Sequence, residues 1–96
     1  MRYIRVVWEH DFDEPVLIFS ELDEEGWEIR KVQVYRNGHS EWADATYETD
    51  SVGLSEIPVP GVEEISSDPE FQAELIDADD FERAWLAAQA GRDPGA

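Results

Sequence analysis

The first half of the chain alternates between apolar and polar positions in a way that predicts β-strands. Residues 3–10 (YIRVVWEH) have a period of two, since Ile4, Val6 and Trp8 fall on one side. Three further strand-like runs follow, over residues 15–23, 27–36 and 39–48. Because successive strand side chains point to opposite faces, this pattern predicts four strands within residues 3–48.

A hairpin signal separates the last two of these runs. Asn37–Gly38 predicts a two-residue loop, because both residues of such a turn need positive φ. In that register Arg36 lies opposite His39 and Lys31 lies opposite Asp44, a favourable cross-strand pair of opposite charges. One hairpin face then carries Arg30, Val32, Val34, Ala43, Ala45 and Tyr47, and the other carries Trp27, Ile29, Lys31, Gln33, Tyr35, Trp42 and Asp44.

The second half of the chain changes character. Prolines punctuate residues 49–69, and we expect a loop, a short helix near Val62–Ser66 and a turn at Asp68 and Pro69 that starts a helix. The clearest helix comes last, with Asp77 as its N-cap and Gly91 as its stop. Its apolar stripe, spaced at i, i+3, i+4 and i+7, consists of Phe81, Ala84, Trp85 and Ala88.

Strands followed by helices predict an α+β fold. We expect an antiparallel four-stranded meander, then a short helix, then an amphipathic C-terminal helix packed on one sheet face. Residues 1–90 are predicted to form a single domain and residues 91–96 a flexible tail.

Composition narrows the function classes. The 96 residues include 24 acids and 7 bases, giving a net charge of -17. No Lys or Arg occurs from Val6 to Ile29 or from Asn37 to Glu82. Such a surface repels nucleic acid and anionic lipid and attracts basic proteins. Cysteine is absent, and no apolar run resembles a signal peptide or approaches the roughly 20 residues of a membrane span. We therefore expect a soluble cytoplasmic protein without a cofactor or a metal.

The stretch WEHDFDE, residues 8–14, is the best candidate for chemistry. His10 with Asp11, Asp13 or Glu14 could ligate a metal, but a zinc site needs four ligands and His39 is the only other histidine. His10 with Asp11 or Glu14 could act as a general base, yet no nucleophile motif or phosphate loop accompanies it. The favoured interpretation is structural, with Trp8 and His10 ending a strand on its core side.

The acid run ELDEEGWE, residues 21–28, is either a solvated turn or a docking surface for a basic protein. The aromatic hairpin face bears on this choice. If the aliphatic face packs on the helix, Trp27, Tyr35 and Trp42 stay near solvent among acids, as in an interface hot spot. If the aromatic face is the buried one, Trp27 and Trp42 pack against Phe81 and Trp85.

The chain also resembles a known family over about residues 2–86. Its most specific matching parts are Trp8 with His10, Glu14–Val16, Ser20–Glu21 with Asp23, Trp27–Glu28, and Arg30–Val32. The chain is similar to a bacterial family of small acidic proteins classed as a domain of unknown function. Gln33 departs from the acid expected after Val32. This resemblance supports one fold across the chain and supplies no catalytic residues.

We expect an acidic protein-binding module, most concretely an immunity-type inhibitor that masks a basic partner such as a nuclease toxin. The expected partner-binding residues are Glu21, Asp23, Glu24, Glu25, Tyr35 and Trp42, and the expected structural residues are Trp8, His10, Phe81 and Trp85. Glu and Asp would replace phosphates in Arg and Lys contacts. Two alternatives remain: a small enzyme or ligand-binding domain that uses His10, and a DNA mimic that blocks a DNA-binding protein.

Overall fold

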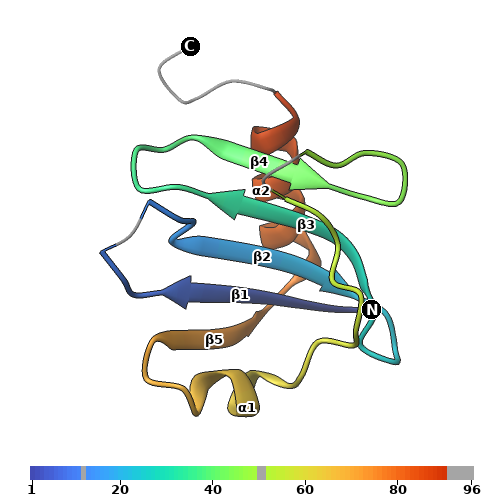
Figure 1. The fold of residues 1–96 in the computed structure, drawn as a ribbon. Coiled ribbons are helices and arrows are strands. Elements are labelled where there is room, and N and C mark those ends of the chain that lie inside the picture. Colours follow the sequence, from blue (N-terminus) through green and yellow to red (C-terminus); the bar gives the residue numbers. More distant parts are fainter. Residues whose placement is uncertain (12, 50–51, 91–96) are drawn as a thin grey trace.

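The structure, a computed structural model, describes residues 1–11, 13–49 and 52–90. Its elements are β1 (Arg2–Trp8), β2 (Leu17–Leu22), β3 (Glu28–Val34), β4 (Ser40–Ala43), α1 (Val62–Ser66), β5 (Phe71–Ile76) and α2 (Ala78–Gln89). The five strands form one antiparallel sheet in the order β4-β3-β2-β1-β5 (Figure 1). This confirms an α+β fold with an antiparallel sheet and a C-terminal helix. The tail predicted for residues 91–96 lies outside the described residues.

A fifth strand corrects the predicted four-stranded sheet. β1 to β4 form the expected meander, and β5 pairs with β1 on the edge opposite β4. The turn at Asp68 does not start a helix. Its Oδ1 accepts the N–H of Glu70 at 2.9 Å, its carbonyl accepts the N–H of Phe71 at 3.0 Å, and the chain enters β5. The strand forms because β1 offers an unpaired edge, a long-range condition that local propensity does not contain.

Each face of the sheet has its own apolar cluster. On one face, Phe81, Trp85 and Ala88 of α2 surround Val32. The apolar stripe predicted for this helix is thereby confirmed, and Asp77 caps it by accepting the N–H of Asp80 at 2.8 Å. On the other face, α1 and Val59 cover a second cluster, whose buried members are Ile4, Val6 and Leu22.

The β2–β3 and β3–β4 hairpins each have a three-residue loop with the same hydrogen-bond pattern. In the β3–β4 loop, the N–H of Tyr35 donates to the carbonyl of His39 at 2.8 Å, and the N–H of Gly38 donates to the carbonyl of Tyr35 at 2.9 Å. Gly38 has φ +91°, whereas no described non-glycine residue has positive φ. Asn37 therefore does not adopt the conformation that a two-residue turn requires, and the predicted loop length is wrong.

The extra loop residue shifts the register by one. Lys31 lies opposite Ala43 and Val32 lies opposite Trp42, instead of the predicted Lys31–Asp44 and Val32–Ala43 pairs. Because strand side chains alternate, this shift places Trp42 on the same face as Val32, the face that α2 covers. The predicted division of the hairpin into an aliphatic face and an aromatic face is therefore wrong for Trp42.

Candidate functional site

Segments that carry exposed acids meet at one end of the sheet. Because neighbouring strands are antiparallel, the start of β1, the β2–β3 turn and the end of β4 share this end (Figure 1). Residues 52–60 return along it, and the N–H of Val59 donates to the carbonyl of Gly26 at 2.8 Å. No Lys or Arg occurs in residues 22–28 or 44–60. We call this surface the acidic end and define it by Asp23, Glu24, Glu25, Asp44, Glu48 and Glu56.

The β2–β3 turn fixes the first part of the acidic end. Asp23 Oδ1 accepts the backbone N–H groups of Glu25 and Trp27, both at 2.9 Å, so this carboxylate shapes the turn. Gly26 has φ +91°, and a Cβ there would meet the carbonyl oxygen of Val59 at 3.2 Å. Glu24 and Glu25 are exposed. Of the predicted partner-binding acids in this run, these two have side chains that point into solvent without a structural task in the turn.

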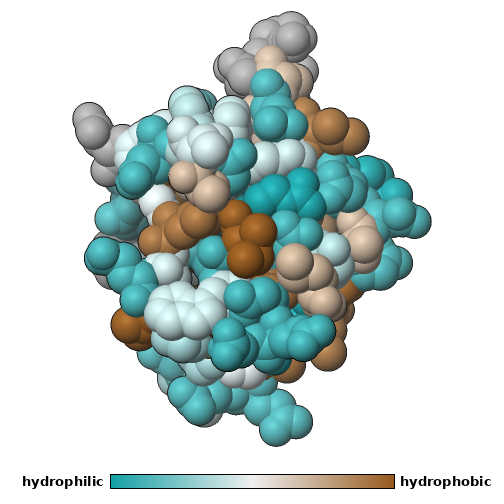
Figure 2. All heavy atoms as spheres, turned by 90° about the vertical axis from the view of Figure 1, so that its right-hand side faces the viewer, coloured by the Kyte–Doolittle hydropathy of each residue, from teal (hydrophilic) through white to brown (hydrophobic). Residues whose placement is uncertain are grey.

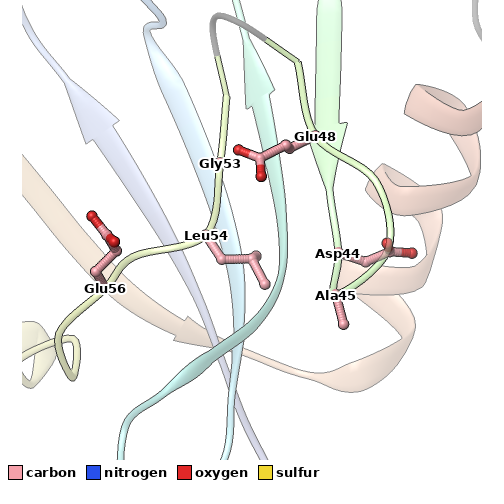
Figure 3. A pocket seen from close by; sticks show the side chains of 6 residues that line it. All are labelled: Asp44, Ala45, Glu48, Gly53, Leu54 and Glu56. Atoms are coloured by element: carbon pink, nitrogen blue, oxygen red, sulfur yellow. The ribbon is translucent and has the colours of Figure 1, made fainter.

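A hollow of about 470 Å³ forms the second part (Figure 3). It is lined by Asp44, Ala45, Glu48, Gly53, Leu54 and Glu56. Figure 3 shows its three carboxylates pointing in different directions from two segments of the chain, with the Leu54 side chain between Glu56 and Asp44 and the Ala45 side chain below Asp44. The hydrogen bond from the backbone N–H of Thr46 lowers the pKa of Asp44 and so favours its charged form. The hollow is therefore lined by three carboxylates and by the apolar side chains of Ala45 and Leu54.

Apolar side chains are exposed on the same segments. Trp27 is 41% exposed, Tyr47 44% and Ile57 69%. Figure 2 looks directly at this end of the molecule and shows apolar residues at the centre of the view, bordered by hydrophilic ones. Apolar area surrounded by charge is typical of a protein interaction surface.

A buried carboxylate anchors the segment that forms the hollow. A β-bulge at Ile29 turns Glu28 to the α1 face, because Glu21 lies opposite Arg30 while Leu22 lies opposite Glu28. The Glu28 carboxylate accepts bonds from Ser20 Oγ and from the N–H of Ser55, both at 2.7 Å. Lys31 Nζ lies 3.2 Å from Glu28 and donates to the carbonyl of Gly53 at 3.2 Å. These bonds hold Gly53 and Ser55, and with them the segment that lines the hollow, against β3.

Glu21 was predicted to contact a partner, but its carboxylate is buried and paired within the protein. It is 7% exposed, and Arg30 Nε and Nη2 donate to its two oxygens at 2.6 and 3.0 Å. The Arg30 guanidinium also pairs with Glu82 of α2. The hydrogen bond from Arg30 lowers the pKa of Glu21, while burial and the bond to Glu21 raise the pKa of Tyr3. Glu21 holds Arg30, which joins the sheet to α2, and Glu21 does not belong to the surface.

The two predicted aromatic anchors also take other positions. Trp42 is half-buried, lies 5.2 Å from Trp85 edge to face and stacks on Tyr47 at 4.0 Å between ring centroids. Tyr35 is half-buried near the β3–β4 loop, with its ring 5.7 Å from that of His39. Tyr35 lies at the end of the sheet opposite the acidic end. The exposed aromatic residues of this surface are Trp27 and Tyr47.

The residues around WEHDFDE form a corner of the sheet. Trp8 stacks on Phe71 at 5.5 Å, and its Nε1–H donates to Glu70 at 2.9 Å. His10 Nε2 lies 2.8 Å from the carbonyl oxygen of Pro15, and its ring packs edge-on against Trp8 at 4.4 Å. These contacts are those of residues that hold a strand end in place, and the geometry adds no support to a catalytic role for His10.

Residues 1–11, 13–49 and 52–90 contain neither a metal-binding cluster nor a membrane-spanning helix. No three His, Asp or Glu side chains in these ranges converge as a metal site would require. No helix in them is both long enough and apolar enough to cross a bilayer.

The sequence interpretation missed Asp44, Glu48 and Glu56. The signal that could have found them is the absence of bases from residues 37–82, which left every acid of that segment without a local counter-charge. The local pattern did not show that residues 52–60 return to the β2–β3 turn.

The fold and its acidic end define a small α+β domain whose distinctive surface is electrostatic. A family model described as a domain of unknown function (DUF6881) matches residues 2–90, and the chain belongs to this family. No curated protein and no solved structure gave a significant match.

Proposed function

We propose that this chain is an acidic protein-binding module that acts in the cytoplasm and masks a basic partner. The observation that carries the proposal is the acidic end, where six carboxylates gather on segments without Lys or Arg. Such a surface raises the encounter rate with a basic protein and disfavours acidic competitors.

An immunity-type inhibitor of a nuclease toxin is the concrete form of this proposal. A nuclease holds phosphates with Arg and Lys, and the carboxylates of Glu24, Glu25 and Glu56 can take the place of those phosphates. The hollow beside Leu54 offers aliphatic surface for the methylene stem of a Lys or Arg side chain. Exposed Trp27 supplies the aromatic contact that such interfaces favour.

The proposal is tested by capture of a partner under native conditions. The chain is immobilised beside a matched Glu24→Gln, Glu25→Gln variant, because both side chains are exposed and their amides leave the turn unchanged. We expect the parent to retain a basic protein that elutes with salt. The double variant should bind this protein at least tenfold more weakly.

For a captured nuclease, cleavage of labelled DNA is then measured with and without the chain. Recovery of no basic protein, or a partner whose binding is indifferent both to salt and to the double variant, contradicts the proposal.

A further inference from the structure

The two edge strands of the sheet, β5 and β4, differ in how far other parts of the chain cover their outward backbone groups. At β5, Ser66 Oγ of α1 bonds the N–H of Ala73 at 2.9 Å and its carbonyl at 3.3 Å, while Asp68 accepts the N–H of Phe71. α1 therefore closes this edge against pairing with another strand. The opposite edge, β4, has no such cover over its central residues in the part of the chain that the structure describes.

The backbone of β4 offers hydrogen bonds outward. Tyr35 and His39 form a hydrogen-bonded pair, so antiparallel alternation bonds Glu41 to β3 and directs the N–H and C=O groups of Ser40 and Trp42 away from it. No described residue bonds these outward groups. The open stretch ends at Asp44, whose N–H donates to the carbonyl of Tyr47 at 2.9 Å.

α2 extends beyond this edge. Trp85 already lies against Trp42 of β4, and the residues after it, 86–90, span about 7 Å at 1.5 Å per residue. Neighbouring strands are about 4.8 Å apart, so the last turn of α2 would lie behind one additional strand. Figure 1 shows this turn rising past β4. Its outward residues are uncharged, and Leu86 is 63% exposed.

We propose that the β4 edge accepts an extended segment of the basic partner as a sixth strand, an inference that rests on the proposed function. The segment has apolar side chains on the α2 side, where Trp42 lies. It has Lys or Arg towards the end of the edge, where Asp44 and Glu48 lie; the Glu41 carboxylate in the middle of the edge is already held by Thr49 Oγ1 at 2.6 Å and lies 3.2 Å from His39 Nε2. A second copy of this chain fits poorly, because each copy carries a net charge of -17.

The test measures amide hydrogen exchange by NMR with a capped seven-residue peptide of alternating Lys and Val as the probe. We expect the amides of Ser40 and Trp42 to exchange at least tenfold more slowly with the peptide, while the Leu75 amide of β5 is unchanged. A peptide of alternating Glu and Val is the charge control.

A pair of variants separates backbone pairing from general attraction. Ser40→Pro removes one outward N–H and no bond to β3, so it should fold and bind the peptide at least fivefold more weakly. Ser40→Ala keeps the N–H and should bind like the parent. If Ser40→Pro fails to fold, the exchange rates of the Ser40 and Trp42 amides in the parent decide whether the peptide pairs with β4.

Three results overturn this inference. They are absence of peptide binding, binding that leaves the Ser40 and Trp42 amides unchanged, and protection of these amides that rises with protein concentration alone. None of them bears on the capture experiment with the Glu24→Gln, Glu25→Gln variant, which tests the proposed function separately.

Discussion

Arg30 connects the sheet to α2 and provides the sharpest test of the packing described above. Its guanidinium pairs with Glu21 and Glu82 and lies 4.8 Å from the ring centroid of Phe81 and 4.9 Å from that of Trp85. Arg30→Met keeps an unbranched apolar chain against both rings and removes the charge. The perturbation therefore isolates the ionic part of the contact.

The magnitude follows from what the substitution leaves behind. The Glu21 side chain is 9% exposed, so Arg30→Met creates a buried carboxylate without its main partner. Breaking a buried pair in this way costs about 3–5 kcal/mol, a large part of the roughly 5–15 kcal/mol by which such a domain is stable. At about 4–8 °C per kcal/mol, the melting temperature should fall by about 12–40 °C.

The stability lost in Arg30→Met should depend on pH in a characteristic way. In the parent, Arg30 lowers the pKa of Glu21, so the stability from this pair is present above the unfolded pKa, about 4.3, and is lost as pH falls through the folded pKa. In Arg30→Met, burial without the cation raises the Glu21 pKa above the unfolded value. Protonation then relieves the strain, and the deficit should shrink as the pH falls from 7 towards 4.5.

Urea unfolding followed by far-UV circular dichroism at pH 7 and pH 4.5 measures both effects. The Glu21→Gln, Arg30→Met variant, which has no buried charge in this pair, is the matched control and should recover at least half of the loss at pH 7. A deficit below about 1 kcal/mol at pH 7, or the same deficit at both pH values, would refute the reasoning.

Two further predictions follow from the turn and the aromatic residues. Gly26→Ala should lower stability by about 1–2 kcal/mol in urea unfolding, because φ +91° strains an L side chain and the new Cβ presses on the Val59 carbonyl; an unchanged midpoint would contradict this. Trp42→Ala should cost about 2–3 kcal/mol because this half-buried ring packs on Trp85 and Tyr47, whereas Trp27→Ala should cost less than about 1 kcal/mol and instead weaken partner capture, and equal losses of stability would contradict the assignment.

Much of the fold could be predicted because it depends on local pattern. Periodicity gave four strands, the helix at Val62–Ser66 and the C-terminal helix with its Asp77 cap. β5 escaped because its pairing partner, β1, is more than sixty residues away along the chain. The hairpin register escaped because Asn-Gly suits either a two-residue turn or a three-residue loop with Gly38 in the left-handed region.

The site was less predictable, since adjacent acids have different tasks. Within the run 21–28, Glu21 and Glu28 point to opposite faces and are buried, Asp23 shapes the turn, and Glu24 and Glu25 are exposed. Sequence shows that these residues are acidic. The bulge at Ile29 and the loop geometry decide which of them reach solvent.

The distribution of bases explains why the acidic end is left unbalanced. Of the bases in the strands, Arg5 pairs with Glu74 of β5, Arg30 pairs with Glu21 of β2 and Glu82 of α2, and Lys31 pairs with Glu28 of its own strand. These cations are therefore neutralised within the sheet and its contacts, and their fields fall off quickly outside it. The β2–β3 turn and the segment 44–60 contain acids but no Lys or Arg. Negative potential must then concentrate where the strands end, which is where Glu24 and Glu25 lie and where a basic partner would first be attracted.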